Sequence, residues 1–125
     1  MKARGAQGNN RKRSHWWGVV AEYLCAVFLV LKGYSILKLR YRNQAGEIDI
    51  IALKAKTLAF IEVKARENTE DALHSVTPAK QAILAQAANI FVAANPRFLH
   101  TDLRFDVMVV TSPAKIYHFK DAWRT

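Results

Sequence analysis

Two carboxylates and a lysine in the middle of the sequence have the types and spacing that metal-dependent hydrolysis requires. Asp49 and Glu62 lie in two β-prone segments, 46–53 and 57–65, and Lys64 follows Glu62 by two residues. Two carboxylates that face each other repel unless a cation lies between them. A hard divalent cation, Mg²⁺ or Mn²⁺, suits a site built from oxygen atoms, and a lysine beside it can orient water and stabilise negative charge. The competing interpretation is an ordinary charged, solvent-facing sheet surface.

The register of the two segments decides whether these side chains meet. A short polar connection between them predicts an antiparallel hairpin in which Asp49 lies opposite Glu62, with Cβ atoms about 5 Å apart. Lys64 shares that face, because strand residues two apart point to the same side. Ile48 and Ile50 are expected to point to the other face and to pack into the core.

A third carboxylate lies in an apolar stretch near the N-terminus. Glu22 is the one charged residue between Arg13 and Lys32. A buried carboxylate is costly unless it is paired or bound to a metal. Glu22 therefore contributes to a metal site at the acidic hairpin, faces solvent, or pairs with an arginine such as Arg42.

The elements that must position these residues follow from apolar periodicity and from helix caps. One helix is predicted from about 15 to 32, ended by Gly33, and a second from the cap Thr77-Pro78 to about Ala94. The polar stretch 67–76 is predicted to be a loop. Strands are predicted at 34–42, 46–53, 57–65, 104–111 and 115–119. The order α-β-β-β-α-β-β predicts an α/β fold with a small mixed sheet of four to five strands flanked by helices.

The charge of the chain favours a polyanionic partner and argues against acidic-protein mimicry. Lysine and arginine total 19 against 10 aspartate and glutamate, for a net charge of +9. Residues 1–13 hold five of the basic groups and no acid, so the remainder is only mildly basic. Residues 1–14 are predicted to be a disordered basic arm, and 15–125 a single domain.

The single Cys25 excludes an intrachain disulfide and a cysteine-based zinc site, which favours a reducing, cytoplasmic compartment.

The apolar run 16–31 invites comparison with a membrane segment. It is shorter than the roughly 20 residues that a span needs, and Glu22 interrupts it. We predict a buried helix with no stable membrane association. Binding to a membrane surface through the basic arm and this run stands as a third interpretation.

Taken in order, these residues resemble the PD-(D/E)XK nuclease superfamily and, more closely, the YraN-like family of uncharacterised proteins, relatives of archaeal Holliday junction resolvases. The resemblance covers 18–110 and rests on Glu22, on Gly33-Tyr34-Ser35-Ile36-Leu37, on GEIDIIA with Asp49 and on IEVKAR with Glu62 and Lys64. It implies a restriction endonuclease-like fold. It also implies a metal-dependent nuclease acting on DNA, with branched or damaged DNA among the candidate substrates.

The resemblance also implies roles for individual residues. Asp49, Glu62 and the backbone carbonyl of Val63 would bind Mg²⁺ or Mn²⁺, Lys64 would be the catalytic lysine, and Glu22 an outer ligand. Basic and polar groups expected to contact nucleic acid are Arg40, Arg42, Arg66, Lys80 and Gln81. The last two match a Lys-Gln position of the family.

Other features of the pattern leave alternatives open. Arg40 stands where relatives often have asparagine. Asp106 is predicted to form a salt bridge or to end a strand rather than to bind metal. The alternative function is a non-catalytic nucleic-acid-binding module with the same fold, and a homodimer is compatible with the sequence.

Overall fold

The computed structural model describes the backbone of residues 2–124 and the side chains of residues 17–124. The elements, in chain order, are α1 (Lys2–Leu31), β1 (Ser35–Arg42), β2 (Glu47–Lys54), β3 (Thr57–Ala65), α2 (Thr69–His74), α3 (Pro78–Ala94), the 3₁₀ helix η1 (Pro96–Phe98), β4 (Asp102–Ser112) and β5 (Lys115–Trp123). This order confirms the predicted succession of helices and strands, with α2 and η1 added.

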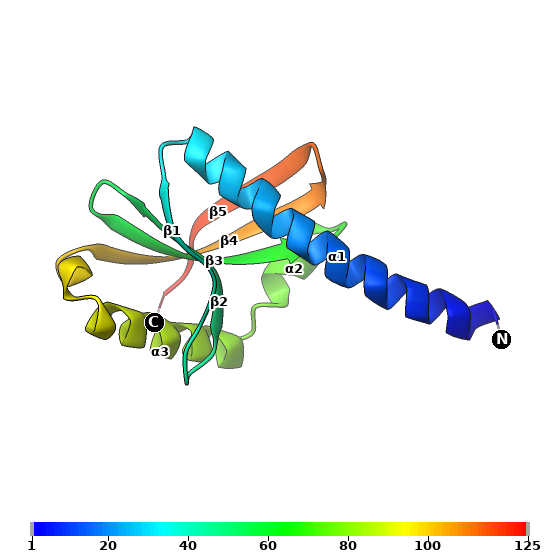
Figure 1. Ribbon diagram of the computed structural model, residues 1–125, viewed down its shortest axis with the longest axis horizontal. Coiled ribbons are helices and arrows are strands. Elements are labelled where there is room, and N and C mark those ends of the chain that lie inside the picture. Colours follow the sequence, from blue (N-terminus) through cyan, green and yellow to red (C-terminus); the bar gives the residue numbers. More distant parts are fainter. Residues whose placement is uncertain (1, 125) are drawn as a thin grey trace.

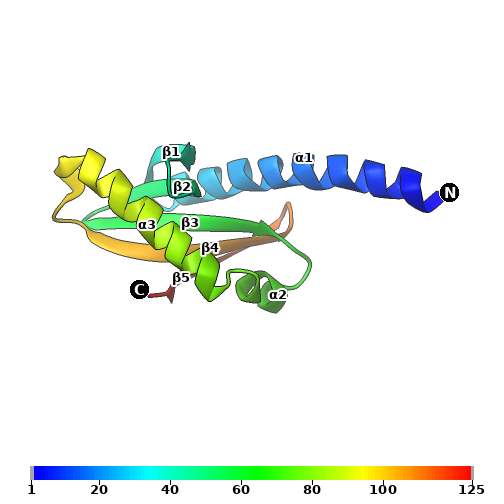
Figure 2. The ribbon, with the colours of Figure 1, turned by 90° about the horizontal axis from the view of Figure 1, so that it is seen from below.

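The strands form one five-stranded sheet in the order β1-β2-β3-β4-β5. β3 and β4 are parallel and the other neighbours are antiparallel, so the sheet is mixed, as predicted. A parallel pair needs a crossover, and α2 and α3 supply it. Helix α1 covers one face of the sheet and α3 covers the other (Figures 1 and 2). The result is a three-layer α/β fold.

Strand alternation divides the core into two clusters, one on each face of the sheet. In β3, Leu58 and Phe60 pack with α3, whereas Ala59 and Ile61 pack with α1. The α1 side also holds Ala21, Cys25, Leu29, Tyr34, Met108 and Val110. The α3 side holds Leu84, Ala87, Ala88, Phe91, Phe98, Phe105, Val107 and Val109. Because both faces of β3 are buried, polar residues at its end lie beside two packed layers.

Helix α1 begins at Lys2, so the prediction of a disordered arm over 1–14 and a helix from about 15 is wrong. No proline interrupts 2–31, and the lysines, arginines, alanines and glutamine of the first turns are good helix formers. The N-terminal part of α1 projects beyond the sheet (Figure 1). Among the described residues, no helix combines the length and the apolar character needed to cross a bilayer.

The end of α1 is set by Gly33, as predicted. Its φ is +93°, a conformation that glycine adopts without steric cost. The Tyr34 N–H donates to the Leu29 carbonyl and the Gly33 N–H to the Val30 carbonyl, each at 3.0 Å. This is the Schellman pattern, which satisfies the last carbonyls of the helix and turns the chain into β1.

Helix α3 has the predicted bounds because its caps are encoded locally. The Thr77 hydroxyl accepts a hydrogen bond from the Lys80 N–H at 3.2 Å, and Pro78 occupies the first helical position. The loop predicted over 67–76 is wrong, since it contains α2. The Asn68 side chain accepts from the Glu70 and Asp71 amides and so caps this short helix.

Candidate active site

Asp49 and Glu62 meet where β2 and β3 separate. The two strands pair in the predicted register, which ends with Ile50 opposite Ile61. One residue further, the Val63 N–H donates to Asp49 Oδ2 at 2.8 Å, and the Asp49 side chain also hydrogen-bonds Glu62. The end of the hairpin ladder therefore brings the two carboxylates together, as the sequence predicts.

Beside the site, the alternation of faces in β2 breaks. Ile50 packs on the α1 side, but Ile48 belongs to the cluster on the α3 side. In β1, Arg40 lies between the partners of these two residues and has φ +53°. A left-handed residue rotates the strand, so the prediction that Ile48 and Ile50 share a face is wrong.

Arg40 has a backbone conformation that is unusual for arginine, with φ of +53°. Asparagine is among the non-glycine residues that tolerate the left-handed region best, whereas other side chains lose about 1–2 kcal/mol there. Arg40 instead donates its Nε–H to Glu22 at 2.9 Å. The Arg40 side chain thus forms an ion pair with α1 while its backbone stays in this less favourable region.

Burial and charge repulsion perturb the ionisation of Asp49. Burial, together with hydrogen bonding to Glu62 and repulsion from Glu62, raises the pKa of Asp49 to about 8. The Val63 amide opposes this rise, because it favours the charged carboxylate. With a pKa of about 8, the Asp49 carboxyl is largely protonated near neutral pH.

Two lysines lie beside the Glu62 carboxylate. Lys64 Nζ is 3.7 Å and Lys80 Nζ 3.5 Å from the same atom, Glu62 Oε2. The Glu62 side chain is 5% exposed, so these contacts act in a desolvated setting. Lys64 comes from β3 and Lys80 from α3, which places Glu62 between two elements.

The donor set fits a hard divalent cation. The half-buried Asp49 and the buried Glu62 offer carboxylate oxygens side by side, and oxygen ligands are those that Mg²⁺ and Mn²⁺ prefer. Within the described part of the chain, no group of three or more His, Cys, Asp or Glu residues gathers to hold a metal. Further ligands would have to be the Val63 carbonyl, water or substrate oxygens. Mg²⁺ sites of this kind are common.

Glu22 pairs with Arg40 rather than with Arg42. Arg42 instead donates to Glu47, at 2.7 Å between Nη2 and Oε2. Glu22 still contributes to raising the pKa of Asp49. Its position is therefore that of an outer carboxylate, beside the pair rather than in contact with it.

A cavity of about 210 Å³ joins α1 to the end of β3. Its lining residues are Trp17, Gly18, Glu22, Val63, Lys64, Ala65 and Arg66. Four of these are predicted site residues. Trp17 is not among the predicted site residues, because no spacing pattern distinguishes it from other aromatic residues of α1.

Three other residues predicted to contact nucleic acid are Arg42, Arg66 and Gln81, of which Arg66 lines this cavity. Arg42 and Arg66 are exposed, and Arg66 Nη1 donates to the Ala65 carbonyl at 3.0 Å. The Gln81 side-chain amide donates to the Val76 carbonyl at 3.0 Å and so holds the start of α3.

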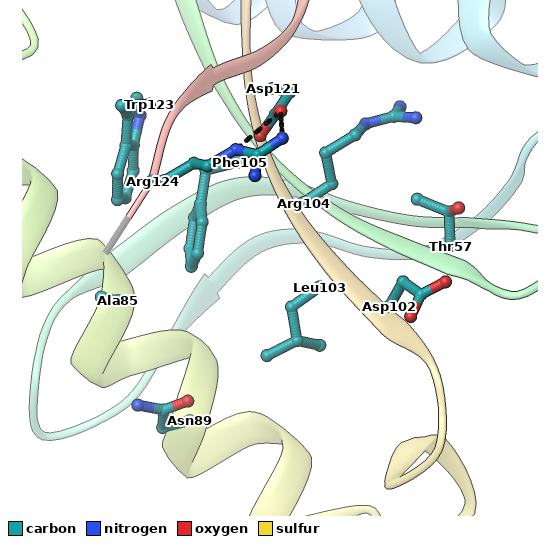
Figure 3. Close-up of a pocket in the computed structure, with 10 residues that line it drawn as sticks. All are labelled: Thr57, Ala85, Asn89, Asp102, Leu103, Arg104, Phe105, Asp121, Trp123 and Arg124. Carbon is teal, nitrogen blue, oxygen red and sulfur yellow. Dashed lines mark hydrogen bonds and ion pairs between the residues drawn. The ribbon is translucent and has the colours of Figure 1, made fainter.

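A second cavity, of about 420 Å³, lies at the opposite end of the sheet (Figure 3). It is bounded by Ala85 and Asn89 of α3 and by the beginning of β4, and Trp123 closes one side (Figure 3). Thr57, which also lines it, begins β3, whereas Glu62 lies near the other end of that strand. None of the sequence-predicted site residues lines this cavity.

Asp106 is a further buried carboxylate, on the α1 side of β4. Arg104 donates to both of its oxygens at 2.8 Å, His118 Nε2 lies 2.8 Å from Oδ2, and the Asp121 N–H donates to Oδ1 at 2.9 Å. Arg104 also donates to the Tyr34 hydroxyl at 2.7 Å. Burial by itself raises the pKa of Asp106, but the hydrogen bonds with His118, Arg104 and the Asp121 amide lower it below its ordinary value. The predicted salt bridge is confirmed.

Comparison with known proteins identifies the family to which the chain belongs. Residues 21–110 match the model of the uncharacterised protein family UPF0102. The chain is 45% identical over 93 residues to a UPF0102 protein of Bradyrhizobium diazoefficiens, covering 74% of this chain and 70% of the relative. It is 40% identical over 113 residues to one of Rhizobium etli, covering 90% and 93%. The matched region contains Glu22, Asp49, Glu62 and Lys64, so the resemblance to the YraN-like family is confirmed, and the chain belongs to the UPF0102 family.

Proposed function

We propose that this protein is a metal-dependent nuclease of the PD-(D/E)XK superfamily that hydrolyses phosphodiester bonds in DNA. The observation that carries the proposal is the contact between Asp49 and Glu62 with Lys64 beside them. A merely solvated sheet surface would leave such carboxylates exposed, whereas Glu62 is 5% exposed and Asp49 has a pKa raised to about 8. A carboxylate with a perturbed pKa beside a cavity is typical of catalytic sites.

Each residue of the site has its own role in the proposed hydrolysis. Asp49, Glu62 and the Val63 carbonyl would hold the Mg²⁺ or Mn²⁺ ion, which supplies Lewis-acid polarisation of the phosphate. The Val63 amide orients the Asp49 carboxylate. Lys64 orients the attacking water and stabilises the negative charge that develops on the phosphate. Glu22 acts as an outer carboxylate, with Arg40 setting its orientation.

The surroundings of the site suit a nucleic-acid backbone. Arg40 and Arg42 side chains are 45% and 77% exposed, and Arg66 lines the 210 Å³ cavity beside Lys64. Arginine binds phosphate oxygens through charge-assisted hydrogen bonds. Lys80 is the fourth basic group, and a metal between the carboxylates would free it from Glu62 to contact phosphate.

A cleavage assay on linear, flapped and four-way DNA, with and without Mg²⁺ or Mn²⁺, tests the proposal. The nuclease should cut at least one substrate only when the metal is present, and Asp49→Asn should abolish cutting. A protein that binds all three substrates and cuts none would instead be the non-catalytic binding module.

Metal binding gives a test that does not depend on finding the substrate. Asp49→Ala and Glu62→Ala should each abolish Mn²⁺ binding measured by calorimetry, because each removes one of the two carboxylates proposed to hold the ion. The exposed Asp102→Ala is the matched control and should bind as the wild type does. Unchanged affinity in both site variants, with circular dichroism showing intact folds, would contradict the site.

The basic N-terminal segment should contribute to DNA affinity in a salt-dependent way. Deleting residues 1–13, which carry five basic groups, should weaken duplex binding and flatten the dependence of log K on log salt. Each lost phosphate contact should reduce that slope by about 0.9. Affinities of full-length and truncated protein across a salt series decide this, and superimposable slopes would leave recognition to the folded surface.

A further inference from the structure

The outward face of α1 is apolar over the part whose side chains the structure describes. Tyr23, Val27, Val30 and Leu31 are 60%, 59%, 55% and 82% exposed, and every exposed residue of α1 in 17–31 belongs to this set. Their spacing puts them on one stripe of the helix. The opposite stripe, which includes Cys25, is buried against the sheet. The run predicted to be a buried helix is thus buried on one side only.

No other described element covers this stripe. Helix α1 is the outermost layer on its face of the sheet, and α3 lies on the opposite face (Figures 1 and 2). Contiguous exposed apolar surface is unfavourable in water and marks interaction sites.

The charges of the same helix indicate the kind of partner. Glu22, the one charged residue between Arg13 and Lys32, is ion-paired to Arg40 and is 18% exposed, so the stripe itself carries no charge. The preceding residues 2–13 of α1 hold five basic groups and no acid. Trp16 and Trp17 separate the basic part from the apolar part. Aromatic residues between basic and apolar segments are typical of helices at a membrane–water interface.

We propose that α1 binds reversibly to an anionic lipid surface. The stripe Tyr23–Val27–Val30–Leu31 enters the boundary between headgroups and acyl chains, and the basic segment attracts the anionic headgroups. Nucleic acid would use the basic segment but would leave the stripe in water. A second copy would cover the stripe but would bring two chains of net charge +9 together. This attachment is peripheral and salt-sensitive.

Vesicle sedimentation tests the proposal with the full chain. Wild type should sediment with vesicles of phosphatidylcholine and phosphatidylglycerol, less so at high salt, and weakly with phosphatidylcholine alone. Val27→Glu and Val30→Glu should each lower the partition coefficient by about tenfold or more, since each places a charge in the apolar boundary. Leu99→Glu is the matched control: Leu99 is 64% exposed, lies outside α1, and its substitution should have no effect.

Three outcomes would overturn this assignment. Wild type that fails to sediment with the anionic vesicles refutes it directly. Equal binding by both glutamate variants, with normal circular dichroism, would show that the basic segment acts without the stripe. A wild-type dimer that both variants convert to monomer in sedimentation velocity would assign the stripe to a second copy.

Discussion

Lys64→Ala is expected to lower the rate of phosphodiester cleavage by about a hundredfold to a thousandfold, the range for removing one group that stabilises developing charge. Metal affinity should change little, because the proposed ligands Asp49 and Glu62 remain in place. DNA affinity should also change little, since the exposed arginines remain. Single-turnover cleavage, with calorimetry for Mn²⁺, separates these effects.

The control for this substitution is Lys120→Ala. Lys120 is an exposed lysine of β5, outside the candidate site, and its loss should leave the cleavage rate unchanged. Robust activity of purified protein that survives Lys64→Ala would refute the assigned role of this lysine. An equal loss of cleavage rate in Lys64→Ala and Lys120→Ala would show that the lower net charge, rather than a catalytic role of Lys64, causes the effect.

Asp106→Ala is expected to lower the free energy of unfolding by about 3–5 kcal/mol, the cost of removing one partner of a buried ion pair. The substitution leaves the Arg104 guanidinium, 21% exposed, without its carboxylate, and leaves His118 without its partner. Urea denaturation measures the loss. Asp121→Asn is the control, because its pair with Arg124 is solvent-exposed and is worth about 0–1 kcal/mol.

The same substitution should change the response to acid. The pKa of Asp106 is lowered by folding, so this group stabilises the protein above its ordinary pKa of 3.8 and loses that contribution as pH falls through the folded value. The difference in unfolding free energy between wild type and Asp106→Ala should therefore shrink below about pH 4. A difference that stays constant down to acid pH would contradict the assigned network.

Local pattern was sufficient for the elements whose signals lie within a few residues. The bounds of α3 follow from Thr77-Pro78 at one end and from Asn95 before Pro96 at the other. Gly33 likewise ends α1, because its left-handed backbone conformation is a local signal for a helix end. The hairpin register follows from a two-residue turn, since turn length sets which residues face each other. Hence the meeting of Asp49 and Glu62 was predictable from the sequence.

The sequence by itself determined the succession of helices and strands, the hairpin and the identity of the carboxylates and the lysine, because each depends on neighbours in the chain. Only the tertiary structure decided their partners. Lys80 reaches Glu62 from another helix, and Arg40 rather than Arg42 meets Glu22 because its backbone is left-handed. Such contacts join residues far apart in sequence, and their geometry depends on how α1 and α3 pack on the two faces of the sheet. For the same reason, the sequence could not show which stripe of α1 is exposed and which is buried. That depends on which side of the helix packs against the sheet.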